Sequence, residues 1–284
     1  MVVAFQGERG AFGELAAVEY FGRKVRPLPV PEFADVFKAV EKQKAAYGII
    51  PIENSQAGSI HHNYDLLLEN RLFIAGEILL RVSHYLIANP GVSRRSIRRI
   101  YSHPQALVQC RRYLRRFPNI ETIPVSNTAS GVRLIRDHGL RDAAAIASMQ
   151  AMIDYDMKCL AKRIEDNPNN MTRFLILAGR PARKKSGRRP MKTSIVFSTK
   201  DIPGALFKAL SVFALRDINL FKIESRPVHG KGFEYLFYLD LEGESYAEAQ
   251  RNAIQHLQEI TSFYRMLGSY PAGRLAHPEY RRRR

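Results

Sequence analysis

The pattern in which predicted strands and helices follow one another changes once along the 284-residue chain, near residue 180. This change constrains the fold more than any other feature. Before it, short runs rich in aliphatic residues alternate with segments in which apolar side chains recur every three or four positions. Such an alternation of strands and helices is typical of α/β domains with mostly parallel sheets. Because ligands bind beyond the carboxyl ends of the strands in these sheets, we expect the functional site in loops that follow strands.

The predicted elements of this first region are the strands 2–6, 25–30, 46–51, 72–88, 98–101, 120–125, 143–147, 158–163 and 171–178, and the helices 12–21, 32–43, 59–69, 104–115 and 128–138.

A polar segment from Gly179 to Pro190 separates this region from a second one. Its prolines, glycines and basic residues mark a linker. After it, the periodicity predicts strand, helix, strand, strand, helix and strand, which is the ferredoxin-like order. These elements are 192–199, 203–215, 219–226, 233–241, 246–259 and 262–268. The predicted organisation is an α/β domain over 1–179, a linker over 180–191, a ferredoxin-like domain over 192–270 and a disordered basic tail over 271–284.

The formal net charge of +17 lies largely outside the predicted domains. Six basic residues of the linker and the four arginines Arg281 to Arg284 supply ten of the excess charges, which leaves 17 − 10 = 7 for the rest. We interpret the linker and the tail as solvated segments, and a contact with a polyanion is the alternative. Because no RNA-recognition or helix-turn-helix motif accompanies these charges, we do not expect nucleic acid as a partner.

The sequence indicates neither a membrane nor an oxidising compartment. Its apolar stretches are soon interrupted by charges such as Glu77, and the N-terminus has no basic region followed by a cleavable apolar segment. The two cysteines, Cys110 and Cys159, are far apart and fit no metal-binding or redox spacing. A cytoplasmic protein without a membrane partner is therefore expected.

The stretch PIENSQAGSI carries the densest polar chemistry after a predicted strand. Gly58 and Ser59 precede a run with helical periodicity, so we expect their amides to form the anion-binding N-terminus of a helix. Glu53, Asn54 and Ser55 are expected to point into the same space as Ser59. A capped helix start with a solvated acid is an alternative that these residues alone leave open.

Two further polar stretches follow or precede predicted strands. In SHPQALVQC, Ser102 and Gln105 fit a capping box, and Gln109 shares the polar face of the predicted helix. In NMTRF, Thr172 suits the start of a buried strand, and Arg173 offers a planar group of donors for a carboxylate. Spacing alone does not separate a structural from a functional interpretation of these residues.

Other candidate sites are weaker. Glycines between Gln6 and Gly13 form a turn from strand to helix whose amides can approach an anion, but their spacing is not the dinucleotide-binding motif. His61 and His62 point about 100° apart on a helix, so they cannot easily bind one ion. We expect no metal and no dinucleotide.

Taken together, the motifs resemble those of prephenate dehydratase, including the similar arogenate dehydratases. The matching stretches are FQGERGAFGELAA, PIENSQAGSIHHNYDLLL, SHPQALVQC, SNTASG, AAIAS and NMTRF, followed by PGALFKAL and ESRP, which match the family's C-terminal ACT regulatory domain. The resemblance implies an α/β catalytic part with two subdomains, like a periplasmic binding protein, here 1–76 with 168–179 and 77–167. It implies a cofactor-free reaction in which prephenate loses its ring carboxylate as CO2 and its C4 hydroxyl, giving phenylpyruvate for phenylalanine biosynthesis.

The resemblance also implies roles for individual residues. The residues expected in catalysis are Glu53, Asn54, Ser102, Gln109 and Thr172. Those expected to bind substrate are Ser55, Gly58, Ser59 and Arg173. Because a hydroxyl group is a poor acid, we expect Thr172 to act as an oriented donor to the leaving oxygen. The chain departs from the family at Ala11 and Gly13, where hydroxyl residues are usual, so binding in that loop is left to backbone amides.

In the small domain, the resemblance implies that phenylalanine binds between two ACT domains as a feedback inhibitor, and hence a homodimer or homotetramer. The residues expected at this site are Gly204, Ala205, Leu206, Asn219, Glu224, Ser225 and Arg226. A ferredoxin-like domain that serves dimerisation alone is the alternative. For the whole chain, arogenate dehydratase and a non-catalytic sensor of small molecules remain open.

Overall fold

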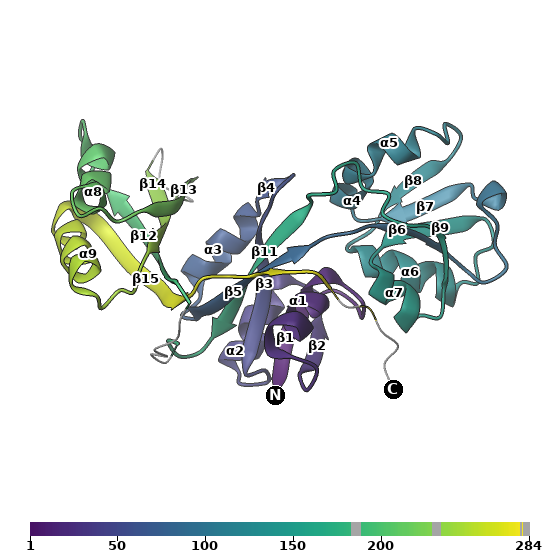
Figure 1. Cartoon of the computed structure of the whole chain (residues 1–284), viewed down its shortest axis with the longest axis horizontal. Coiled ribbons are helices and arrows are strands. Elements are labelled where there is room, and N and C mark those ends of the chain that lie inside the picture. The colour runs from purple at the N-terminus through teal and green to yellow at the C-terminus, as the bar shows by residue number, and fades with distance from the viewer. Residues whose placement is uncertain (183–188, 229–233, 279, 281–284) are drawn as a thin grey trace. The chain divides into compact units, whose positions relative to one another are not determined.

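The structure, a computed structural model, describes residues 1–182, 189–228, 234–278 and 280 (Figure 1). The chain divides into two compact units. The first unit comprises residues 1–66, 78–175 and 274–284, and the second comprises residues 67–77 and 176–273.

The amino-terminal sheet is built on β1, whose central residues Val3, Ala4 and Phe5 are fully buried. Its strand order is β16-β5-β11-β3-β1-β2, with β4 paired to β3. β1 pairs in parallel with both β2 and β3, as the alternation of strands and helices predicts. The strands are β1 (Val2–Gln6), β2 (Arg26–Val30), β3 (Tyr47–Asn54), β4 (Gly58–Ser59), β5 (Phe73–Arg81), β11 (Met171–Ala178) and β16 (Leu275–Ala276), and the helices are α1 (Phe12–Phe21), α2 (Phe33–Glu41) and α3 (His61–Glu69).

The middle sheet lies wholly in the first unit and has the strand order β10-β6-β9-β7-β8. β9 is an alanine-rich strand with no exposed surface, and α6 packs so closely on β7 that a Cβ atom on Gly131 would lie 3.1 Å from the Tyr101 carbonyl oxygen. The strands are β6 (Tyr85–Ala88), β7 (Arg99–Ser102), β8 (Glu121–Pro124), β9 (Ala143–Ala147) and β10 (Lys158–Ala161), and the helices are η1 (Arg94–Ser96), α4 (Pro104–Gln109), α5 (Arg111–Leu114), α6 (Thr128–Asp137) and α7 (Met149–Asp154).

The carboxy-terminal sheet belongs to the second unit and is antiparallel, with the order β13-β14-β12-β15. Phe197 of β12, Phe213 of α8 and Leu257 of α9 meet in its core with almost no exposed surface. This is the predicted ferredoxin-like topology, in which the first and third strands are central. The strands are β12 (Met191–Thr199), β13 (Leu220–Pro227), β14 (Tyr235–Glu242) and β15 (Thr261–Pro271), and the helices are α8 (Ala205–Ala214) and α9 (Glu248–Ile260).

Within the second unit, residues 67–77 are joined to this sheet by polar contacts. Arg265 of β15 donates to the carbonyl oxygens of Leu68 and Asn70 at 2.8 and 2.5 Å. Lys192 of β12 forms a buried ion pair with Glu77 at 2.7 Å. Arg265 of β15 therefore holds the segment that leads into β5, and Lys192 of β12 holds β5 itself.

Two of the predicted elements are interrupted in the structure. The predicted strand 72–88 is wrong, because the chain leaves the amino-terminal sheet after Arg81 and enters the middle sheet at Tyr85. The predicted helix 104–115 is interrupted at Cys110, whose ψ of 18° ends α4 and precedes α5.

The predicted disorder of the tail is wrong for its first part. Leu275 and Ala276 pair in parallel with β5, and the ring of Tyr280 packs edge-on against Tyr85 with 6.2 Å between centroids. Residues 183–188 of the predicted linker and Arg281–Arg284 of the tail lie outside the described residues. No helix in the described part of the chain combines the length and the apolarity that a membrane span requires.

Candidate functional site

The polar stretch after β3 forms a tight hairpin. The side-chain oxygen of Asn54 accepts hydrogen bonds from the backbone amides of Gln56 and Ala57 at 2.9 and 3.0 Å, which is a turn that asparagine favours. Gly58 has a φ of +77° and pairs with Asn54 in the short strand β4. The expectation that Gly58 and Ser59 form the N-terminus of a helix is therefore wrong, because the chain reverses and pairs before α3 begins at His61.

Asn54 is also the centre of a largely buried cluster of three amide side chains and one hydroxyl. Its Nδ2 donates to Asn170 Oδ1 at 2.8 Å, to the Met171 carbonyl at 3.1 Å and to Thr172 Oγ1 at 2.9 Å. Gln109 Nε2 donates to Asn54 Oδ1 at 3.1 Å, and Asn170 Nδ2 donates to Gln109 Oε1 at 3.0 Å. We call Asn54, Gln109, Asn170 and Thr172 the amide cluster. It joins the end of β3, the end of α4 and the start of β11.

A pocket of about 170 Å³ that is lined mostly by polar residues adjoins this cluster. Its lining residues are Gln56, Gln105, Val108, Gln109, Glu165, Asp166, Asn167 and Asn170. Glu165 and Asp166 accept hydrogen bonds from the backbone amides of His84 and Arg112 at 2.9 and 3.0 Å. Thr172 is not a lining residue but keeps 8 % of its surface exposed, and its hydroxyl is linked to the lining through Asn54.

His84 and Asn170 belong to this arrangement and were not predicted from the sequence. Nε2 of His84 lies 2.9 Å from Gln109 Oε1, and burial lowers the pKa of the imidazole. A signal for His84 is present, since Ser83 and His84 interrupt a long apolar run. Asn170 stands at the end of a polar loop directly before β11, where a buried polar side chain needs partners.

Glu53 and Arg173 form an ion pair with each other. They lie on the face of β3 and β11 opposite to the face that carries Asn54 and Thr172. Nη1 of Arg173 lies 3.6 Å from Glu53 Oε2. Successive side chains of a strand point to opposite faces, so Glu53 cannot share the face of Asn54. The expectation that Glu53, Asn54, Ser55 and Ser59 point into one space is wrong for this reason.

Two predicted hydroxyl residues serve structural contacts. Ser102 is fully buried and donates to the Ile146 carbonyl at 2.6 Å, outside the amide cluster. The predicted capping box is wrong, because α4 begins at Pro104 and His103 Nδ1 accepts the hydrogen bond from the Gln105 amide. Ser55 lies beside the cluster: its hydroxyl donates to the Asn169 carbonyl and accepts from the Met171 amide, at 3.1 and 3.0 Å.

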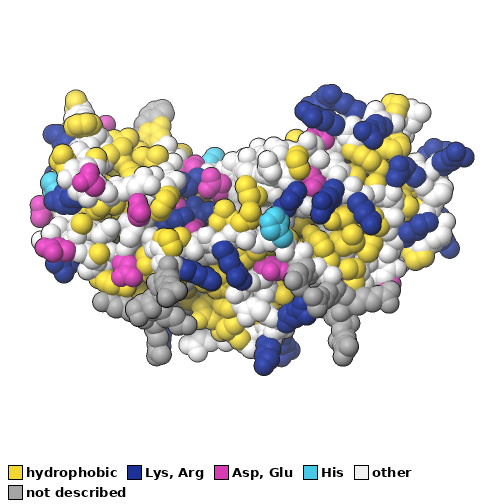
Figure 2. All heavy atoms as spheres, viewed as in Figure 1, with side chains coloured by type: hydrophobic (Ala, Val, Ile, Leu, Met, Phe, Trp, Pro, Cys, Tyr) yellow, Lys and Arg dark blue, Asp and Glu magenta, His cyan; other side chains and the backbone are white. Residues whose placement is uncertain are grey.

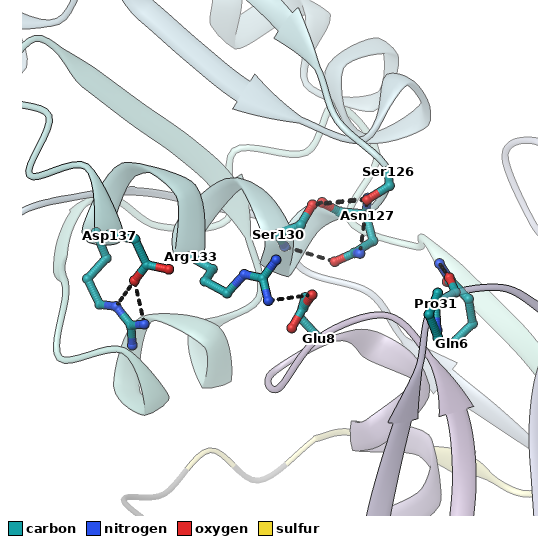
Figure 3. A network of polar contacts seen from close by, with 9 residues as sticks. Gln6, Glu8, Pro31, Ser126, Asn127, Ser130, Arg133 and Asp137 are labelled. Carbon is teal, nitrogen blue, oxygen red and sulfur yellow. Dashed lines mark hydrogen bonds and ion pairs between the residues drawn. The ribbon is translucent and has the colours of Figure 1, made fainter.

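The turn after β1 meets α6 and α7 of the middle sheet. Glu8 pairs with Arg133 of α6 at 3.0 Å, and Asn127 caps the same helix through the Ser130 amide at 2.8 Å (Figure 3). The Ser148 hydroxyl donates to the Gly10 carbonyl at 2.6 Å.

Three amides of this glycine turn are already engaged. Those of Gly7, Gly10 and Ala11 donate to the Val30 carbonyl, to Glu14 Oε2 and to the Glu8 carbonyl, at 2.9, 2.7 and 3.0 Å. These three amides are therefore not free to bind an anion, and an anion site at the first turn of α1 stays a prediction.

Basic side chains gather on the part of the first unit that holds the middle sheet, as Figure 2 shows. Between Tyr85 and Asp166 the sequence has 14 Lys and Arg and 7 Asp and Glu, a balance of 14 − 7 = +7. Arg111, Arg112 and Arg115 are exposed on and after α5, close in sequence to Gln109. An anionic ligand is attracted to such a surface.

The predicted effector residues lie around α8 and β13 in the second unit. Gly204 precedes α8 with a φ of +76°, a conformation that glycine adopts without strain. Glu224 pairs with Lys222 at 3.3 Å, whereas Asn219 and Ser225 are exposed. β13 is an end strand of the carboxy-terminal sheet, so its outer edge carries no strand among the described residues.

Comparisons with known proteins agree with this architecture. Residues 3–182 match the prephenate dehydratase family model and residues 193–251 match the ACT domain. Arogenate dehydratase/prephenate dehydratase 2, chloroplastic, from Arabidopsis thaliana is 47% identical over 278 residues, 95% of this chain and 72% of that protein.

Two solved structures superpose on most of the chain. A prephenate dehydratase from Arthrobacter aurescens in complex with L-Phe has a TM-score of 0.85 at 31% identity, over 95% of this chain and 90% of that chain. A protein described as a novel type of quorum quenching acylase, GqqA, has a TM-score of 0.87 at 32% identity, over 96% and 98%.

The fold class predicted from the sequence, a periplasmic-binding-protein-like catalytic part with a ferredoxin-like ACT domain, is confirmed by the sheets and by these comparisons. The prediction of a dehydratase, an enzyme of the lyase class, is confirmed as well. On the family match over more than half of its length, this chain belongs to the prephenate dehydratase family and carries an ACT domain after the catalytic part.

Proposed function

We propose that the chain converts prephenate to phenylpyruvate. The C1–carboxylate bond breaks to release CO2, the electron pair moves through the ring, and the C4–oxygen bond breaks. The leaving hydroxide takes one proton and departs as water, so the products are phenylpyruvate, CO2 and water. The group that must be stabilised is the departing oxygen, which needs a hydrogen-bond donor aimed at it.

One observation carries this proposal: Thr172 Oγ1 accepts a hydrogen bond from Asn54 Nδ2 at 2.9 Å. The amides of Gln56 and Ala57 donate to the oxygen of Asn54, so the atom that faces Thr172 is the nitrogen, which can only donate. The hydroxyl hydrogen of Thr172 is therefore directed away from Asn54 and is available for the leaving oxygen. Asn54 thus orients Thr172 as a donor.

The same contact argues against a nucleophilic role for Thr172. A hydroxyl nucleophile needs a base that takes its proton, as acyl transfer requires. Asn54 Nδ2 is a donor and cannot act as that base. Although GqqA is described as an acylase, the geometry of the amide cluster favours a dehydratase in this chain.

We also propose roles for three other residues that were predicted to form the site. Gln109 lines the pocket, and its exposed neighbours on α5 attract a dianion. Arg173 follows Thr172 directly in sequence and is paired with Glu53. To bind a carboxylate of the substrate, it would have to leave this pair. The hydroxyl of Ser102 donates to the Ile146 carbonyl, so we assign Ser102 a role in positioning other groups and not in contacting the substrate.

Steady-state kinetics with prephenate and with arogenate tests the proposal. We expect the higher kcat/KM with prephenate and phenylpyruvate as the product. A preference for arogenate, with phenylalanine as the product, would make the chain an arogenate dehydratase, an activity that the Arabidopsis relative's name includes. Binding of either compound without turnover would support the sensor instead.

We also propose that phenylalanine inhibits the enzyme through the ACT domain in a homo-oligomer in the cytoplasm. The Arthrobacter structure contains L-Phe, and Gly204, with its left-handed conformation, directly precedes the first turn of α8, where backbone amides can bind a carboxylate. Exposed Phe221 and Ile223 on the edge strand β13 are suited to a second copy of the domain. Inhibition curves of a Gly204→Val variant and sedimentation of the wild type test these statements: intact inhibition, or a monomer with phenylalanine bound, would contradict them.

A further inference from the structure

His84 is held rigidly beside the amide cluster by its own backbone. Its amide donates to Glu165 Oε2 at 2.9 Å, and its carbonyl accepts from the Ile164 amide at 3.0 Å. The side chain is 2 % exposed and packs edge-on against Phe12, with 5.7 Å between ring centroids. The imidazole therefore has one placement, and its only polar contact in the described part of the chain is Gln109.

The direction of each hydrogen bond in the cluster follows from groups of fixed polarity. The amides of Gln56 and Ala57 can only donate, so the atom of Asn54 that faces them is its oxygen. Gln109 must then present its Nε2 to that oxygen, which leaves its Oε1 toward Asn170 and His84. Because Oε1 can only accept, His84 donates from Nε2 and carries its proton there.

We propose that His84 is a positioning residue for the dehydration, which holds Gln109 Oε1 so that the second Nε2 hydrogen of Gln109 is aimed into the pocket at a substrate oxygen. The first Nε2 hydrogen is used on Asn54 Oδ1. The second has no partner among the described residues, and Gln109 lines the pocket. This inference rests on the proposed function, because it assigns Gln109 to the same substrate.

Substitutions that keep or remove the donor at the Nε2 position test this role. In His84→Gln the side-chain nitrogen can occupy the place of Nε2 and donate to Gln109, whereas His84→Asn is too short to reach it. His84→Leu removes the donor at similar volume. We expect kcat/KM for prephenate to fall about tenfold or more in His84→Leu and His84→Asn, and about threefold or less in His84→Gln. Thermal unfolding of each variant shows whether the fold is kept.

Two further measurements separate positioning from a structural role. In a Gln109→Leu background, which leaves no acceptor, His84→Leu should have little further effect on kcat/KM. In the folded wild type, the nitrogen resonances of His84 should show the proton on Nε2. The inference would be overturned by full activity of His84→Leu or by an equal loss of activity in His84→Gln and His84→Leu. It would also be overturned by independent losses in the double variant or by a proton on Nδ1.

Failure of the inference is distinguishable from failure of the proposed function. If the wild type is active and His84→Leu is equally active, His84 has no positioning role and the chain is still a dehydratase. A wild type that turns over neither prephenate nor arogenate removes the proposed function and, with it, the catalytic meaning of the Gln109 contact.

Discussion

The buried ion pair between Glu77 and Lys192 provides a quantitative test of how the second unit is held together. The Glu77 side chain is 1% and the Lys192 side chain 11% exposed, and Nζ lies 2.7 Å from Oε1. Glu77 Oε1 also accepts from the Gly273 amide at 2.8 Å. At this distance the attraction is about 6 kcal/mol for an effective dielectric constant of 20, and the desolvation of both groups offsets much of it.

We expect Glu77→Gln to lower the free energy of unfolding by about 3–5 kcal/mol, because it leaves the ammonium group of Lys192 buried without its anion. A double variant, Glu77→Gln with Lys192→Met, should recover most of this loss, since it removes the uncompensated charge. Urea unfolding followed by circular dichroism measures both. The matched control is Asp35→Asn, whose partner Lys38 is 61% exposed, and which should cost less than about 1 kcal/mol.

Equal destabilisation by Glu77→Gln and Asp35→Asn would contradict this prediction, and so would a double variant that is as unstable as the single one. The first result would mean that Lys192 reaches solvent with little movement. The second would mean that the loss comes from the Gly273 contact of Glu77 rather than from the unpaired charge.

Three further predictions concern single residues. Gly13→Ala should raise the free energy of unfolding by about 0.5 kcal/mol in thermal or urea unfolding, because a Cβ atom there meets its nearest neighbour at an ordinary 3.5 Å and the helix gains propensity. Gly10→Ala should cost about 2–4 kcal/mol in the same assay, because its Cβ atom would lie 2.4 Å from the Ala151 Cα atom; Gly139→Ala, which has the same kind of φ and open space, is the control and should cost about 1 kcal/mol. Since burial lowers the pKa of His84, the unfolded chain binds the proton more readily, so stability should fall as the pH drops below about 6.5, and His84→Gln should reduce that slope.

Much of the fold follows from local pattern. The short apolar run Ala143–Ala147 forms a buried strand, as its length and composition predict. Val36 and Val40, four positions apart, lie on the buried face of α2, as helical spacing predicts. The run 72–88 was misread as one strand because both of its halves are apolar, and the exit from one sheet to another at Ser83 and His84 depends on distant partners.

The candidate site was predictable only in part. Asn54, Gln109 and Thr172 were identified through the family resemblance, and the structure brings them into one cluster. Asn170 and His84 were missed because their importance lies in contacts across the fold with Asn54 and Gln109. The tail strand β16 was missed for the same reason, since two residues paired with β5 carry no local signal.

The most direct test of the account is the rate of phenylpyruvate formation from prephenate by Thr172→Val and Thr172→Ser. Valine keeps the shape of threonine and removes the donor, whereas serine keeps the donor. We expect kcat to fall about 100-fold or more in Thr172→Val and by no more than about tenfold in Thr172→Ser. A Thr172→Val variant with the kcat of the wild type would contradict it.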